Sequence, residues 1–166
     1  MSEPPRTATG ELDVSHHQFF LLDDPVKFPT DTVGRRNGLV GTAPGAVVVL
    51  TGIHTGVVNV IEQLHHTEPP VDVTEWDDVV EVSFEAPHGR MIATPLMTDP
   101  PPDLLTLSFH GPGPYRLRVH ARGRDNAVDL APEEVVETYL LSVWPAPVAA
   151  EVVHKQTDAY GAGIRA

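Results

Sequence analysis

Apolar and polar side chains alternate without interruption over residues 115–122 of this 166-residue chain. Because side chains on a β-strand point alternately to opposite faces, this pattern predicts a strand with one face on the core and the other in solvent. The run His-Gly-Pro-Gly-Pro at 110–114 predicts a turn before it. The apolar positions are Tyr115, Leu117, Val119 and Ala121, and the polar positions are Arg116, Arg118, His120 and Arg122.

The Pro-Gly-Pro turn followed by Tyr-x-Leu-x-Val resembles the strand after a tyrosine corner in immunoglobulin-like sandwiches. The alternative is any central antiparallel strand whose arginine-rich face meets solvent. Both interpretations predict an antiparallel strand at this position.

Seven further segments show strand patterns, and turns separate them. Both faces of the first segment become apolar after Gln18, so we expect its second half to be covered on both sides. Asn37-Gly38 is a hairpin-turn candidate, and Pro132-Glu133-Glu134 predicts a short helical turn before the last strand. The second and third segments are expected to pair as an antiparallel hairpin. The seven segments are residues 11–22, 46–51, 57–64, 79–85, 91–96, 104–109 and 137–144.

About eight strands with almost no helix predict an all-β protein, most simply an antiparallel two-sheet β-sandwich. A closed β-barrel is the alternative architecture. The length suits a single domain, which we place at residues 11–148, between a flexible N-terminal tail at 1–10 and a mobile C-terminal tail at 149–166. The 17 prolines and 13 glycines, spread between apolar runs, are typical of many short strands joined by turns.

The chain has no cysteine, which excludes disulfides, cysteine-ligated zinc and thiol chemistry. Its N-terminus lacks the pattern of a signal peptide, and no apolar run approaches the length of a membrane span. We therefore expect a cytoplasmic protein that does not interact with membranes.

The formal net charge of −12 argues against nucleic acid as a partner, because binding to phosphates requires clustered Lys and Arg. Two explanations of this charge remain open. An acidic surface keeps a protein soluble, and it also complements a basic partner and speeds docking by electrostatic steering.

Catalytic and metal chemistry find little support in the sequence. The adjacent histidines 16–17 and 65–66 would point to opposite faces of a strand, so neither pair is expected to ligate one ion. No serine lies in a Gly-x-Ser-x-Gly elbow, and no phosphate-binding glycine motif is present. We predict no catalytic residues, no metal site and no cofactor.

A lone tryptophan surrounded by acidic residues is the candidate partner-binding site, formed by Glu75, Trp76, Asp77 and Asp78. An aromatic anchor with neighbouring carboxylates suits a basic surface. Alternatively, Trp76 closes one end of the sandwich while its neighbours are solvated. The basic cluster Arg116, Arg118, Arg122 and Arg124 is expected to pair with acidic residues on neighbouring strands.

Residues 12–23 resemble the opening strand of the competence protein J family, with matching positions at Leu12, Val14, Ser15, His17, Gln18 and Phe19. Residues 138–141 are similar to that family's final strand. The resemblance implies a small acidic β protein that inhibits a DNA-entry nuclease. The stretches 79–85, 115–125 and 141–147 are similar to uncharacterised actinobacterial proteins of this length.

The leading hypothesis is a non-enzymatic, protein-binding β-sandwich that inhibits a basic nuclease or toxin. The alternative is a β-barrel enzyme that binds a small molecule or uses a histidine-bound metal. A structural subunit of an oligomer is a third option, and the sequence leaves the oligomeric state open.

Overall fold

The computed structural model describes residues 5–29 and 36–166. Within these ranges the chain forms ten strands and one short helix, in place of the eight strands expected. In chain order they are β1 (Arg6–Val14), β2 (Gln18–Asp23), β3 (Val40–Ala43), β4 (Ala46–Leu50), β5 (Gly56–Leu64), β6 (Asp78–Ala86), β7 (Met91–Thr94), β8 (Gly113–Arg122), β9 (Thr138–Pro145), β10 (Val152–Gln156) and α1 (Ala159–Arg165).

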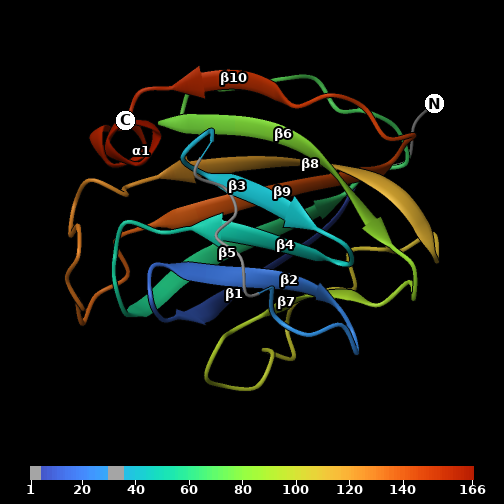
Figure 1. Ribbon diagram of the computed structural model, residues 1–166, viewed down its shortest axis with the longest axis horizontal. Coiled ribbons are helices and arrows are strands. Elements are labelled where there is room, and N and C mark those ends of the chain that lie inside the picture. The colour runs from blue at the N-terminus through green and yellow to red at the C-terminus, as the bar shows by residue number, and fades with distance from the viewer. Residues whose placement is uncertain (1–4, 30–35) are drawn as a thin grey trace.

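The strands form two sheets that pack face to face and do not close into a barrel (Figure 1). One sheet has six strands in the order β1-β5-β9-β8-β6-β10, and the other has four in the order β3-β4-β2-β7. The prediction of an all-β, two-sheet architecture is confirmed. The prediction of purely antiparallel pairing is wrong at one place, because β5 and β9 run parallel. None of the described helices is long and apolar enough to cross a membrane.

The predicted first strand at 11–22 is two strands that belong to different sheets. The chain turns at His16 and His17, which have φ values of 57° and 64°. This left-handed backbone interrupts the extended conformation and lets β2 leave the sheet that contains β1. The second half of the segment is covered on both sides, as expected, since Phe20 and Leu22 form a second apolar cluster with Phe28 and neighbouring residues.

The hairpin expected between 46–51 and 57–64 does not form, because β4 and β5 lie in different sheets. The connection passes Gly52, where a Cβ atom would lie 2.0 Å from the carbonyl oxygen of Arg124. Only glycine permits this close approach. The buried side chain of Ile53 anchors the crossing in the core.

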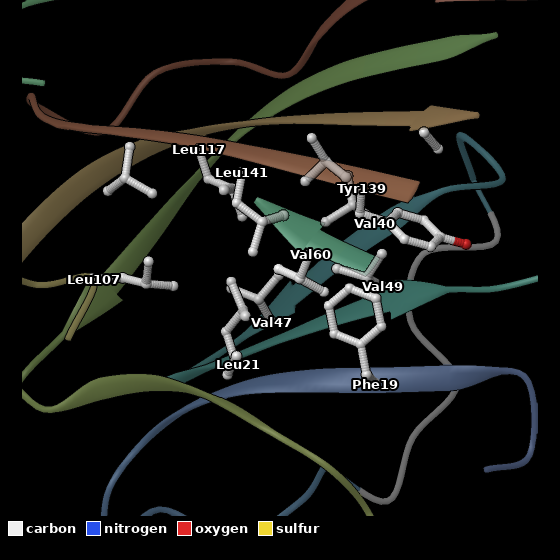
Figure 2. Close-up of a cluster of buried hydrophobic side chains, with 14 of the residues drawn as sticks. Phe19, Leu21, Val40, Val47, Val49, Val60, Leu107, Leu117, Tyr139 and Leu141 are labelled. Carbon is white, nitrogen blue, oxygen red and sulfur yellow. The ribbon is translucent and has the colours of Figure 1, made fainter. Parts of the chain in front are cut away.

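The main core lies between the two sheets (Figure 2). Phe19 and Leu21 of the four-stranded sheet face Val60, Tyr139 and Leu141 of the six-stranded sheet. The rings of Phe19 and Tyr139 meet edge to face, with their centroids 5.3 Å apart. The alternation that predicts β8 as a strand also predicts which of its residues form this core, namely Tyr115, Leu117, Val119 and Ala121.

The tyrosine corner is confirmed at the start of β8. Tyr115 donates a hydrogen bond from its hydroxyl to the carbonyl oxygen of Gly111 at 2.7 Å. The same hydroxyl accepts one from the amide of His110 at 2.9 Å. The ring thus fixes the turn from which β8 departs.

Several local predictions are wrong. Residues 6–10, expected in a tail, form the first half of β1, and the segment 149–166 contains β10 and α1. Residues 104–109 are not a strand, and 132–136 form no helical turn.

Asn37 and Gly38 form a turn that leads into β3, in which Asn37 Oδ1 accepts from the amides of Leu39 and Val40.

Candidate binding groove

A groove of about 380 Å³ lies on the outer face of the six-stranded sheet. Strands β5, β9 and β8 supply its floor, and the loop between β5 and β6 supplies its rim. The floor residues are Ile61, Gln63, Leu140, Ser142, Arg118, His120 and Arg122, and the rim residues are Pro69, Pro70, Asp72, Glu75 and Trp76.

Strand register places the floor residues in two rows across the sheet. Gln63, Ser142 and Arg118 are neighbours in one row. Ile61, Leu140 and His120 are neighbours in the next row, in the same strand order. The first row therefore ends on β8 in Arg118, which is cationic, and the second row ends there in the imidazole of His120.

Two of the three arginines of β8 are buried, although the sequence predicts that they face solvent. Arg116 and Arg118 are 4% and 1% exposed, and both bind Glu81 of the adjacent strand β6. The two nitrogen–oxygen distances are 2.9 and 3.0 Å. The C-terminal segment covers Arg116, which donates to the carbonyl oxygens of Ala149 and Ala150. The predicted pairing with acidic residues on neighbouring strands is confirmed for these two arginines.

Glu81 is the anion that both arginines share. Burial acts to raise its pKa, but hydrogen bonds from His154, Arg116 and Arg118 hold the pKa below its usual value. Glu81 is therefore ionised at neutral pH. Sequence alternation predicts Glu81 on a solvated face, yet it is 5% exposed.

Arg118 lies in the floor of the groove with one nitrogen unpaired. Its Nε donates to Glu81, and its Nη1 donates to the carbonyl oxygens of Pro69 and Pro70 at 3.1 and 3.3 Å. Its Nη2 is buried and has no hydrogen-bond partner in the part of the chain that the structure describes. The guanidinium also lies 4.9 Å from the ring centroid of Trp144.

His120 is a neutral floor residue at pH 7. Burial lowers its pKa to about 4, and the charge of Arg118 acts in the same direction. Its Nδ1 lies 3.1 Å from the carbonyl oxygen of Leu140. Because a carbonyl oxygen only accepts, Nδ1 carries the proton and Nε2 is left as an acceptor.

Trp76 and Glu75, two of the four predicted partner-binding residues, lie at the rim of this groove. Trp76 is 8% exposed and packs between two floor residues, with Arg122 4.7 Å from its ring centroid and the His120 ring 5.4 Å away. The Glu75 side chain is 82% exposed and lies 3.9 Å from Arg122. Trp76 is thus a wall of the groove, with an acidic residue beside it.

The structure places Asp77 and Asp78 away from the groove. Asp77 accepts from the amide of Gly123 at 3.0 Å. Asp78 is fully buried and binds Arg124 at 3.2 Å. Burial raises the pKa of Asp78, and the charge of Asp158 acts in the same direction, while a hydrogen bond from the backbone amide of Asp158 and the charge of Arg124 act to lower it.

Sequence reasoning missed Asp72 and Ser142 as groove residues. Asp72 is exposed and accepts hydrogen bonds from the amide and hydroxyl of Thr74, which hold its pKa below the usual value. Ser142 was one polar residue in a strand that is apolar on both sides. The alternation of β8 indicated a row of polar residues on one face of that strand. It did not indicate that the loop between β5 and β6 covers this row.

No group of three or more His, Asp or Glu residues among 5–29 and 36–166 has an arrangement that could hold a metal ion. The argument against adjacent histidines was nevertheless wrong in its premise, since His16 and His17 lie in a turn. The rings of both approach His54, with centroids 5.4 and 5.2 Å apart. His17 also binds Asp129 at 3.0 Å.

No protein-family model matches the sequence, and no curated protein matches it. Two solved structures are similar in fold, and each covers 87% of this chain and 100% of its own. One is titled crocagin biosynthetic gene J, with a TM-score of 0.58 and 20% identity. The other is ComJ from Bacillus subtilis, titled an inhibitor of the DNA degrading activity of NucA, with a TM-score of 0.60 and 17% identity.

At these identities the similarity shows a shared fold. The resemblance to the competence protein J family, inferred from residues 12–23, is therefore confirmed at the level of fold. Function resides in side chains that a common fold does not determine.

Proposed function

We propose that this protein is a non-enzymatic, protein-binding β-sandwich that inhibits a basic nuclease or toxin. The observation that carries the proposal is the similarity of its fold, over 87% of the chain, to ComJ, an inhibitor of a DNA-degrading activity. The net charge of −12 supports a partner of opposite charge.

The groove rim is the contact surface in this proposal. Glu75 and Asp72 are exposed there and would meet the partner's Lys or Arg side chains, with Trp76 as the adjoining apolar wall. Asp77 and Asp78, also predicted as contacts, would act indirectly by holding the end of this loop and the start of β6. Rim charges of this kind act mainly on the rate of association.

The test is an assay of DNA degradation by a cationic nuclease fraction, prepared from the source organism by cation exchange. Purified protein should inhibit cleavage at about 50 mM NaCl, and the inhibition should weaken strongly at about 300 mM because salt screens exposed charges. Asp72→Asn combined with Glu75→Gln should weaken inhibition by about tenfold through slower association.

A matched control removes two exposed acidic charges outside the groove, Glu133→Gln with Glu134→Gln. This pair should change inhibition by less than about twofold, because it alters only the net charge. Inhibition that is absent, indifferent to salt, or reduced equally by both pairs would contradict the proposal.

A further inference from the structure

The buried charges beneath the groove do not balance within the described chain. Arg116 and Arg118 share a single carboxylate, that of Glu81, and all three side chains are at most 6% exposed. His154 Nε2 also lies 3.1 Å from Glu81, but an imidazole is neutral or cationic and therefore cannot offset the second guanidinium. One guanidinium charge is therefore in excess, and a buried charge without a counter-ion is costly.

The excess charge coincides with the unpaired donor. A guanidinium is a rigid planar fork, so the bonds of Arg118 Nε to Glu81 and of Nη1 to Pro69 and Pro70 fix the direction of Nη2. That nitrogen is buried and without a hydrogen-bond partner among the described residues, while Arg118 lines the groove. Carboxylate oxygens are strong acceptors for such a donor.

A second donor stands beside Arg118. Ser142 is its partner in the register between β9 and β8, lines the same groove and carries a hydroxyl that donates readily. Ile61 and Leu140 occupy the next row of the floor, and Trp76 lies at the rim. The groove thus combines two donors with an adjoining apolar surface.

We propose that this groove binds a small organic monocarboxylate. The carboxylate accepts hydrogen bonds from Arg118 Nη2 and Ser142 Oγ, and the apolar body of the ligand packs against Leu140, Ile61 and Trp76. A cavity of about 380 Å³ suits a ligand with an aliphatic or aromatic ring.

The charges around the groove favour a monoanion over a dianion. Asp72 and Glu75 stand at the rim and repel additional negative charge. Of the floor residues, Arg122 already lies beside Glu75, and His120 is neutral at pH 7. A phosphate dianion would therefore bind less tightly than a carboxylate.

The chain offers a direct optical readout, because both of its tryptophans, Trp76 and Trp144, lie within about 5 Å of a groove arginine. Purified protein is titrated with cyclohexanecarboxylate at constant ionic strength, while tryptophan fluorescence is followed. We expect a saturable change. Cyclohexanecarboxamide, the neutral isostere, and inorganic phosphate should each bind at least tenfold more weakly.

Variants locate the site. Ser142→Ala should weaken cyclohexanecarboxylate binding by about three- to tenfold, and Arg118→Lys, which lacks the Nη2 donor, by more than tenfold. Ser15→Ala, in the turn before β2, is the matched control and should bind like the wild type.

Absence of a saturable response in the wild type, equal binding of the amide, or tighter binding of phosphate would each overturn the proposal. Because the titration on the wild type needs no variant, it remains decisive if Arg118→Lys fails to fold. It also uses the chain alone, so its failure is distinct from a failure of nuclease inhibition.

Discussion

Arg118 and Arg124 are both buried, but their charges are paired in opposite ways. Arg124 is fully buried and fully paired: Nε and Nη2 bind Asp158, Nη2 also binds Asp78, and Nη1 donates to two backbone carbonyls. Arg118 shares its one carboxylate with another arginine and keeps an unpaired nitrogen. Two carboxylates surround one guanidinium in the first case, and two guanidiniums share one carboxylate in the second.

The difference separates a structural contact from a recognition site. The Arg124 network joins the end of β8 to the N-cap of α1 and to the start of β6, segments far apart in the chain. Such a closed network holds elements together and leaves nothing for a ligand. Arg118 also binds the loop between β5 and β6, but it keeps an unpaired buried donor in a side chain that lines the groove.

The largest expected effect is the loss of the closed network. Arg124→Met leaves Asp158 buried without this cation and leaves Asp78 only the more distant Arg165, at 3.7 Å, so the free energy of unfolding should fall by about 3 to 5 kcal/mol. Urea denaturation followed by circular dichroism measures this. Arg122→Met removes an arginine that pairs with exposed Glu75 and lies over the Trp76 ring, and it should lower the free energy of unfolding by about 1 kcal/mol. Equal losses of unfolding free energy in Arg124→Met and Arg122→Met would contradict the difference between buried, paired arginines and exposed ones.

A third buried charge, Glu62, sharpens the comparison because it has no cationic partner in the described ranges. Burial raises its pKa to about 7, although a hydrogen bond from the amide of Leu105 acts to lower it. Since the folded pKa exceeds the unfolded one, its stabilising contribution is complete below about pH 4.5 and is lost as the pH rises through 7. Relative to Glu62→Gln, the wild type should lose about 3 kcal/mol over that range.

Denaturation at several pH values measures this difference between variant and wild type. The comparison with Glu62→Gln is needed because His120 affects stability in the opposite direction. The pKa of His120 is lowered to about 4, so its contribution to the free energy of unfolding is lost as the pH falls from 6.5 to 4. Glu62→Gln retains an acceptor for the Leu105 amide at the position of Oε1. A difference that stays constant with pH would show that Glu62 titrates normally.

The smallest of the three effects on stability is expected at Arg118, whose network keeps an unpaired nitrogen. Arg118→Met leaves Glu81 with two bonds from Arg116, so the free energy of unfolding should fall by about 2 kcal/mol, less than for Arg124→Met. The same urea denaturation compares the two variants directly, since both replace arginine by methionine. A cost as large as that of Arg124→Met would show that Arg118 is a structural contact and would weaken its assignment to a ligand site.

The strand positions were largely predictable because they depend on local pattern. The alternation in 79–85 and 115–122 identified β6 and β8 and their inward residues, the segment 57–64 was predicted as the strand that is β5, and the Tyr115 corner followed from local turn chemistry. The failures occurred where distant segments supply what a strand lacks. β1 begins at Arg6 because β5 provides its hydrogen bonds, and β10 forms because β6 is there to pair with it.

The candidate site divides in the same way. Glu75 and Trp76 were predictable as a tryptophan with acidic neighbours, and the polar side of β8 was visible in its alternation. Asp78 has the same kind of side chain as Asp77, yet it is buried, because Arg124 and Asp158 meet it from other parts of the chain. No local pattern distinguishes an exposed aspartate from one that a distant arginine neutralises.

By itself, the sequence determined an all-β chain, the faces of its central strands, its acidic charge and a likeness in its opening strand to an inhibitor family. These properties depend on side-chain periodicity and composition, which act over a few residues. Tertiary structure alone decided the assignment of β4 and β5 to different sheets, the burial of the β8 arginines and the groove above them. The β4–β5 crossing depends on the close packing of Gly52 against the backbone of Arg124. The buried arginines and their groove arise because burying a charge requires partners, and these come from segments up to about 70 residues apart that only the packed sheets bring together.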